Sequence, residues 1–153
     1  EKRIAEFERV QARDKLSLSQ KALSTALFER GIDAAGFSRI LSKGDEALFG
    51  GANTQAMKKR LAVPGRRPLA DFLPTITIKA KDFANEVTHT QVKQHDLRAE
   101  PVITMEHVRN NTDVRRILTD RDIHPEALPP SEDVRRVQRR LRSDEKHLPR
   151  AKK

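Results

Sequence analysis

Arginine and lysine side chains are concentrated in two short stretches of this chain, where they can bind the oxygens of phosphate or carboxylate groups. Positions 56–68 hold five basic residues and no acidic one, and positions 131–153 hold nine basic and four acidic residues. Each stretch carries a net charge of +5, and the remaining residues sum to −1 against a total of +9. Charge placed in this way is typical of proteins that contact a polyanion, most often the phosphate backbone of nucleic acid. We predict these nucleic-acid-binding residues: Lys58, Lys59, Arg60, Arg66, Arg67, Arg135, Arg136, Arg139, Arg140 and Arg142.

Each basic stretch also has an interpretation that involves no ligand. The two arginines of the first stretch that lie in a proline-bounded loop can brace the turn by bonding backbone carbonyls or Asp71. In the second stretch, Glu132 can pair with Arg135 or Arg136 along one helix. Five arginines within eight residues exceed what the acidic residues before them neutralise, so a binding role is favoured there.

The second stretch carries a narrow apolar seam made by Val134, Val137 and Leu141, at steps of three and four residues. Such a seam packs on its own chain or pairs with a second copy. In the second case the chain forms a homo-oligomer and acts as an interaction module, while the DNA is held elsewhere in the protein.

Residues suited to catalysis are few and scattered. The histidines show no metalloprotease spacing. Asp82 and Glu86 share one helix face and give a hypothesis of metal-dependent nuclease activity, but a solvated pair between Lys79 and Lys81 is the ordinary interpretation. The chain has no cysteine, which excludes thiolate zinc sites and iron–sulfur clusters and fits a reducing cytosol. We therefore expect a protein that is not an enzyme and needs no cofactor or metal.

Helix signals dominate, so we predict an all-α fold. Residues 1–130 are expected to form a compact helical domain, and residues 131–153 a basic carboxy-terminal helix and tail that can protrude from it. No apolar run approaches the roughly 20 residues that cross a bilayer, so we expect no membrane partner. The chain begins with Glu1 rather than Met, and we expect it to lack the amino-terminal region of a longer protein.

Local signals mark the helix ends in the first half of the chain. Gly31 is predicted to end one helix, and Asp33 to cap the next. Gly44 is predicted to end that second helix. Asn53 or Thr54 is expected to cap the short helix that carries the first basic residues.

The second half of the chain is also predicted to be helical. A helix over residues 75–95 is expected to turn this face inward: Ile76, Ala80, Phe83, Val87 and Thr90. After a break at Pro101, Thr104 is expected to cap a further helix, with a kink near Asn110 and Asn111. Ser131 is expected to begin the last helix.

Three strings resemble one known family when they are taken together, in order and with their spacing. They are SKGDEALFGG from Ser42, GRRPLADFLP from Gly65 and PEALPPSEDVRRVQRR from Pro125. They resemble the carboxy-terminal portion of the bacterial DNA-damage-inducible protein D family. The family pattern favours glycine at the position that Asp122 occupies here, so the helix end near Arg121 departs from it.

The resemblance implies a cytoplasmic, nucleoid-associated protein that is induced in the SOS response and acts on DNA or on recombination machinery rather than as a known catalyst. Family members also carry an amino-terminal region similar to the DNA-binding module of phage antirepressors, and this chain holds no match to it. Together with the charge pattern, the resemblance predicts a non-enzymatic DNA-repair protein that binds DNA or a recombinase nucleoprotein filament and modulates it. The alternative is a protein-interaction or oligomerisation module of a phage-antirepressor-like DNA-binding protein.

Overall fold

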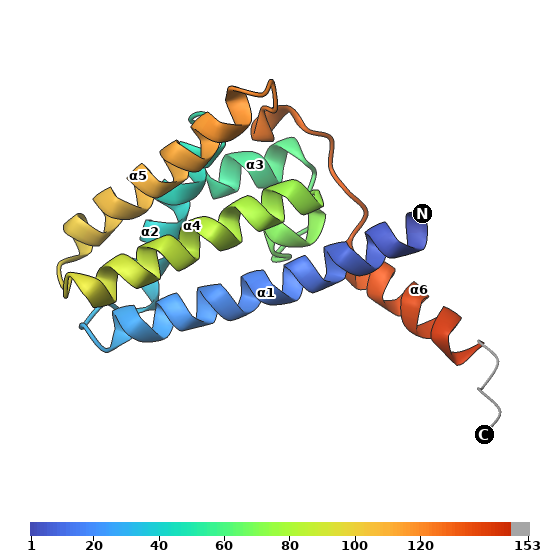
Figure 1. The fold of residues 1–153 in the computed structure, drawn as a ribbon, viewed down its shortest axis with the longest axis horizontal. Helices are drawn as coiled ribbons and strands as arrows, with labels where there is room; N and C mark the ends of the chain where they lie inside the picture. Colours follow the sequence, from blue (N-terminus) through green and yellow to red (C-terminus); the bar gives the residue numbers. More distant parts are fainter. Residues whose placement is uncertain (148–153) are drawn as a thin grey trace.

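The structure, a computed structural model, describes residues 1–147 as helices joined by short connections (Figure 1). Within these residues there are six α-helices, two short 3-10 turns and no β-strand, which confirms the all-α prediction. The elements are α1 (Lys2–Phe28), α2 (Ala34–Leu48), α3 (Thr54–Arg60), η1 (Leu69–Phe72), α4 (Thr75–Gln94), α5 (Glu100–Thr119), η2 (Pro125–Ala127) and α6 (Val134–Lys146). None of these helices is long and apolar enough to cross a membrane.

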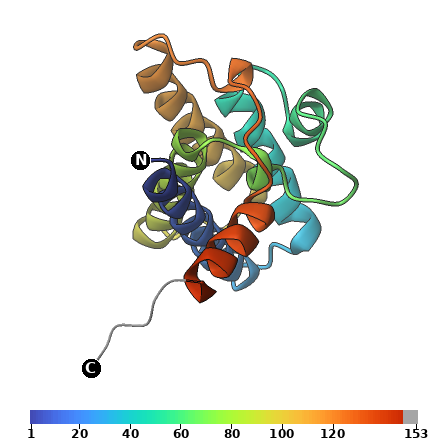
Figure 2. The ribbon, with the colours of Figure 1, turned by 90° about the vertical axis from the view of Figure 1, so that its right-hand side faces the viewer.

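Four long helices form the body of the domain. Helix α1 packs along α4, α2 packs along α5, and α4 packs against α5. Helix α6 crosses the first turns of α1, and its second half extends away from the other helices (Figures 1 and 2). The basic carboxy-terminal helix, which was expected to be able to protrude, thus packs on the bundle at its start and projects from it at its end. Residues 148–153 of the predicted helix and tail lie outside the described residues.

The interior is aliphatic, as expected for a chain with six Phe and no Trp or Tyr. One buried cluster lies where α1, α3 and η1 meet α4, and it includes Leu16, Leu48, Met57, Leu73 and Ile78. A second cluster lies nearer the other end of the bundle and includes Leu23, Leu27, Ile40, Val92 and Ile103. Burial of each such side chain contributes about 1.5–3 kcal/mol, so these two clusters hold the helices together.

The turn between α1 and α2 follows the local signals in the sequence. Gly31 has a φ of +82°, a left-handed conformation that glycine adopts without steric cost. The amide of Ile32 then donates to the carbonyl of Leu27, which closes the end of α1. Asp33 caps α2 by accepting a hydrogen bond from the amide of Gly36 at 2.9 Å. Both predicted helix ends are confirmed.

Helix α2 continues through Gly44 to Leu48, so the prediction that Gly44 ends the helix is wrong. Gly44 is buried where α2 packs on α5, and a Cβ atom at this position would lie 2.5 Å from the ring of His107. The glycine is therefore needed for the close approach of two helices rather than for a turn. The sequence around Gly44 holds no local sign of this distant neighbour.

Helix α4 forms as predicted, and Ala80 of the predicted inward face is buried, but most of that face is not. Ile76 and Phe83 are 42% and 57% exposed, while Ile78, Ala84 and Val92 are buried. The helix packs against α1 on one side and α5 on the other, so its buried arc is wide and includes polar side chains. A hydropathy pattern places polar residues on the exposed face of a helix. The predicted inward face was therefore rotated about the helix axis relative to the face that is buried.

Helix α5 is continuous from Glu100 to Thr119, so the predicted cap at Thr104 is wrong, and the helix is not interrupted at Asn110 and Asn111. Pro101 lies in the first turn, where its missing N–H group costs nothing, and it starts the helix instead of breaking it. The two asparagines at the expected kink are buried and bonded: Asn110 donates to Thr88 Oγ1 at 2.9 Å, and Asn111 donates to the carbonyl of His107 at 2.9 Å.

His107 makes folding stability depend on pH. Burial lowers its pKa from 6.5 to about 4, with a smaller opposing effect of Asp45 and a reinforcing effect of Lys81. The unfolded chain therefore binds a proton between pH 6.5 and pH 4 that the folded chain does not bind. This group should not lower the free energy of unfolding above pH 6.5. As the pH falls from 6.5 to 4, the free energy of unfolding should decrease by at most about 1.4 kcal/mol per pH unit.

Urea unfolding at pH 7 and pH 5 measures this dependence. We expect the His107→Gln variant to be less stable at pH 7, and to lose much less further stability on acidification than the unchanged chain. His95→Gln, which changes an exposed histidine, serves as the control. An unchanged pH slope in the His107→Gln variant would contradict the assignment.

Candidate polyanion-binding surface

The first basic residues lie on the short helix α3. Asn53 caps this helix by accepting a hydrogen bond from the amide of Ala56 at 2.9 Å, as predicted. Met57 is fully buried against the core. The last turn therefore presents its basic side chains around the outside, at the helix end where positive charge is favourable. These side chains are Lys58, which is half-buried, and Lys59 and Arg60, which are exposed.

The two arginines in the loop after α3 have different environments. Arg66 is exposed and has no carboxylate within 4.0 Å in the described part of the chain. Arg67 donates two hydrogen bonds to the carboxylate of Asp133, both at 2.7 Å, and one to Asp71 at 2.8 Å. In this structure Arg67 thus braces the loop and joins it to the start of α6, which is the structural interpretation considered for the loop arginines.

Hydrogen bonding to Arg67 also changes the titration of its partner. It lowers the pKa of Asp133 from 3.8 to about 2, assisted by the amide of Arg135 and opposed by partial burial. The same hydrogen bonds raise the pKa of Arg67. The pair is therefore fully charged at every pH above about 4.

Asp71 is a buried carboxylate on which the loop depends. Its side chain is 5% exposed, and it accepts a hydrogen bond from Arg13 Nε of α1 at 2.8 Å in addition to the one from Arg67. Arg9, one turn earlier on α1, donates to the backbone carbonyls of Asp71 at 2.9 Å and Leu73 at 3.0 Å. Two arginines of α1 thus fix the segment that follows the basic loop.

Helix α6 begins at Val134 with Asp133 as its cap, three residues later than the predicted start at Ser131. Val134 and Val137 are both 2% exposed, because the first turns of α6 pack on α1 and η1 of the same chain. Leu141 is half-buried. Two of the three residues of the predicted oligomer seam are therefore covered within this chain.

The arginines of α6 also differ in their pairing. Arg140 donates to Glu6 of α1 at 2.7 Å and to Glu132 at 2.8 Å, so Glu132 pairs with Arg140 rather than with the nearer arginines expected. Arg135 lies 3.8 Å from Asp71, a long contact. Three further arginines are exposed and have no carboxylate within 4.0 Å among residues 1–147: Arg136, Arg139 and Arg142.

The structure thus brings the two basic stretches next to each other. The pair between Arg67 and Asp133 fixes the loop after α3 at the first residues of α6 (Figure 2). The predicted cations of the two stretches that have no carboxylate partner in the described residues are Lys58, Lys59, Arg60, Arg66, Arg136, Arg139 and Arg142. We call this set the unpaired basic surface.

The acidic pair considered for nuclease activity has no third partner. Asp82 and Glu86 lie on α4, and no group of three or more His, Asp or Glu side chains within residues 1–147 is placed to hold a metal ion. Arg9 and Arg13 of α1 were not among the residues predicted to have a role. The helical spacing could have indicated that Arg9 faces inward, because Arg9 lies on the same buried face of α1 as Ala12, Leu16 and Ser19.

Fold and surface define an all-helical domain with a basic loop and a projecting basic helix. A family model described as the DinD C-terminal domain matches residues 5–137, and the chain therefore belongs to this family. The name of the family indicates a DNA-damage-inducible context, as the resemblance implied. No significant match was found among curated proteins or among solved structures.

The Arg67–Asp133 pair should be worth a measurable part of the folding free energy. We expect Arg67→Ala to destabilise the chain, because it leaves the buried carboxylate of Asp71 and the part-buried carboxylate of Asp133 with fewer partners. Asp133→Asn should destabilise less, and the double variant should show less than the sum of the two losses. Urea unfolding of the four proteins measures this coupling.

Arg66→Ala is the matched control, because it removes the neighbouring arginine, which makes no such pair. We expect its stability to remain within about 0.5 kcal/mol of that of the unchanged chain. If Arg67→Ala were as stable as Arg66→Ala, Arg67 would not brace the loop.

Proposed function

We propose that this chain is a non-enzymatic protein of the DNA-damage response that binds the phosphates of DNA, either as free DNA or within a recombinase nucleoprotein filament. The unpaired basic surface carries this proposal. Its cations lie on α3, in the loop after it and on α6, with no carboxylate of the described residues within 4.0 Å, and the pair between Arg67 and Asp133 joins that loop to the start of α6. Contact with phosphates would release condensed counterions from the nucleic acid, which is the main source of such affinity.

The shape of α6 supports contact with an extended polyanion. The helix has 13 residues and is therefore about 20 Å long. Its first turns pack on the bundle, Arg140 pairs with Glu6 of α1, and the residues from Arg142 onward are exposed in the part of the helix that extends away from the bundle (Figure 1). A projecting basic helix can lie along a phosphate backbone without a clash from the rest of the domain.

A protein-interaction module is the rival function. In that case α6 would pair with a second copy through its apolar seam. The burial of Val134 and Val137 against their own chain supports direct phosphate contact by the arginines over pairing through this seam. Oligomeric state is therefore recorded in the same experiment as binding.

The test is the binding of this chain to labelled single-stranded and double-stranded DNA across a salt series, measured by fluorescence anisotropy. We expect the logarithm of the affinity to fall linearly with the logarithm of the salt concentration. Arg136→Glu combined with Arg139→Glu should weaken binding by roughly tenfold or more and reduce the slope, since two phosphate contacts are lost and two repulsions are added.

The control combines Lys21→Glu and Lys93→Glu, which change the net charge by the same amount at exposed positions on α1 and α4. Both residues belong to the carboxy-terminal parts of their helices, and these ends of α1 and α4 lie away from α6 (Figure 1). We expect the control to keep most of the affinity. Equal losses in both variants would mean that only net charge matters, and no binding at low salt by a stable dimer would favour the rival function.

A further inference from the structure

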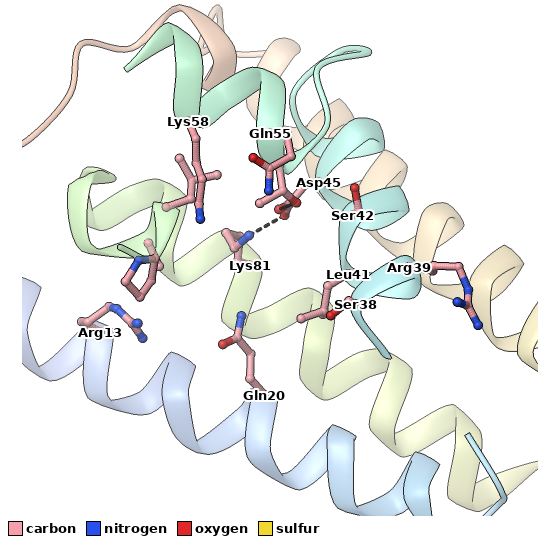
Figure 3. A pocket seen from close by; sticks show the side chains of 14 residues that line it. Arg13, Gln20, Ser38, Arg39, Leu41, Ser42, Asp45, Gln55, Lys58 and Lys81 are labelled. Atoms are coloured by element: carbon pink, nitrogen blue, oxygen red, sulfur yellow. Dashed lines mark hydrogen bonds and ion pairs between the residues drawn. The ribbon is translucent and has the colours of Figure 1, made fainter. Parts of the chain in front are cut away.

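A cavity of about 430 Å³ lies between α1, α2, α3 and α4, with η1 along one side (Figure 3). Its volume is within the range of small-molecule sites. Three basic side chains from three different helices converge on it: Arg13 of α1, Lys58 of α3 and Lys81 of α4. None of the functions discussed so far uses this cavity.

The charges that line the cavity leave it positive. Asp45 is the one acidic residue in its lining; it is buried, and it accepts hydrogen bonds from Lys81 Nζ and, at 2.6 Å, from Thr54 Oγ1. Arg13 is paired through its Nε with Asp71 outside the lining. Lys58 has no carboxylate within 4.0 Å among residues 1–147, so its charge is not neutralised within the described chain.

Uncharged polar and apolar groups also line the cavity, and together with the cations they suit a phosphate ester. Figure 3 shows the amide of Gln20 reaching from α1 toward the space below Lys58 and Lys81. Arg39, by contrast, is turned away and pairs with Glu100 at 2.8 Å. Leu41 and residues of η1 add apolar surface to the lining. Proteins commonly bind phosphate esters through ammonium, guanidinium and amide donors, beside an apolar surface that contacts the organic part of the ligand.

We propose that this cavity binds a phosphate monoester, with the phosphate held between Arg13, Lys58 and Lys81. Two ligands carry such a monoester: a free nucleotide and the 5′-phosphate at the end of a DNA strand. This inference goes beyond the proposed function, because the unpaired basic surface contacts backbone diesters on the outside, whereas the cavity accepts a terminal group. The two share only Lys58.

Two titrations on the full chain test the proposal and separate the sources. Calorimetry with dAMP tests the free nucleotide, with inorganic phosphate as the minimal ligand. Anisotropy with a short single-stranded oligonucleotide compares a 5′-phosphate end with a 5′-hydroxyl end. We expect the chain to bind dAMP, the 5′-phosphorylated oligonucleotide or both. The Lys58→Gln substitution should lower the affinity for the bound monoester roughly tenfold or more.

Lys79→Gln is the matched control, because it removes the same charge from an exposed side chain on α4 that neither lines the cavity nor belongs to the unpaired basic surface. We expect it to leave monoester affinity unchanged. Gln20→Glu is a second variant. It places a negative charge in the cavity and should lower the affinity for the monoester without changing the unpaired basic surface. Thermal unfolding, with and without dAMP, shows that each variant folds and gives a second measure of binding.

The outcomes distinguish this inference from the proposed function. Lys58-dependent binding of dAMP in a chain that binds no DNA would support the cavity while contradicting the proposed function. A preference for the 5′-phosphate end that Lys58→Gln and Gln20→Glu abolish would identify the strand end as the source. If neither dAMP nor the 5′-phosphate is bound better by the unchanged chain than by Lys58→Gln and Gln20→Glu, the cavity proposal is overturned.

Discussion

The position of the basic surface depends on one buried carboxylate, that of Asp71. Its side chain is almost fully covered, and arginines from α1 and from the loop after α3 both bond to it. A carboxylate in such a place is stable only when several hydrogen bonds compensate for its lost hydration. Arg13 and Arg67 supply these bonds, and Arg67 extends the connection to Asp133 at the start of α6. Three segments that are far apart in the sequence are thereby held at one point.

This arrangement also explains why positive charge remains on the outside. The acidic residues near the junction are used by cations that brace the fold: Asp71 and Asp133 bind Arg67, and Glu132 binds Arg140. Their neighbours in the sequence, such as Arg66 and Arg139, are left without a carboxylate in the described part of the chain. The arginine clusters thus divide into members that hold the structure and members that face the solvent.

Local sequence signals predicted the helices and several of their ends, because capping by Asp33 and Asn53 requires only nearby atoms. Features that depend on distant neighbours were missed. Gly44 was interpreted as a helix end, although it is the contact point for His107 of another helix. The charge pattern located both basic stretches, but it did not reveal that Arg67 bonds to a carboxylate 66 positions away. Pairing partners at such separations follow from the packing, which a single sequence does not display.

The ion pair between Lys81 and Asp45 links the cavity to the stability of the bundle. It joins α4 to α2 in a buried position, and Thr54 at the start of α3 bonds to the same carboxylate. A phosphate in the cavity would share Lys81 with Asp45, so its binding and the packing of these three helices would be coupled. A ligand that binds only the packed arrangement stabilises it by mass action, and a rearrangement at Asp45 would in turn change the affinity. Because Lys58 of α3 belongs both to the cavity lining and to the unpaired basic surface, a phosphate bound in the cavity would also engage one of the charges proposed to contact DNA.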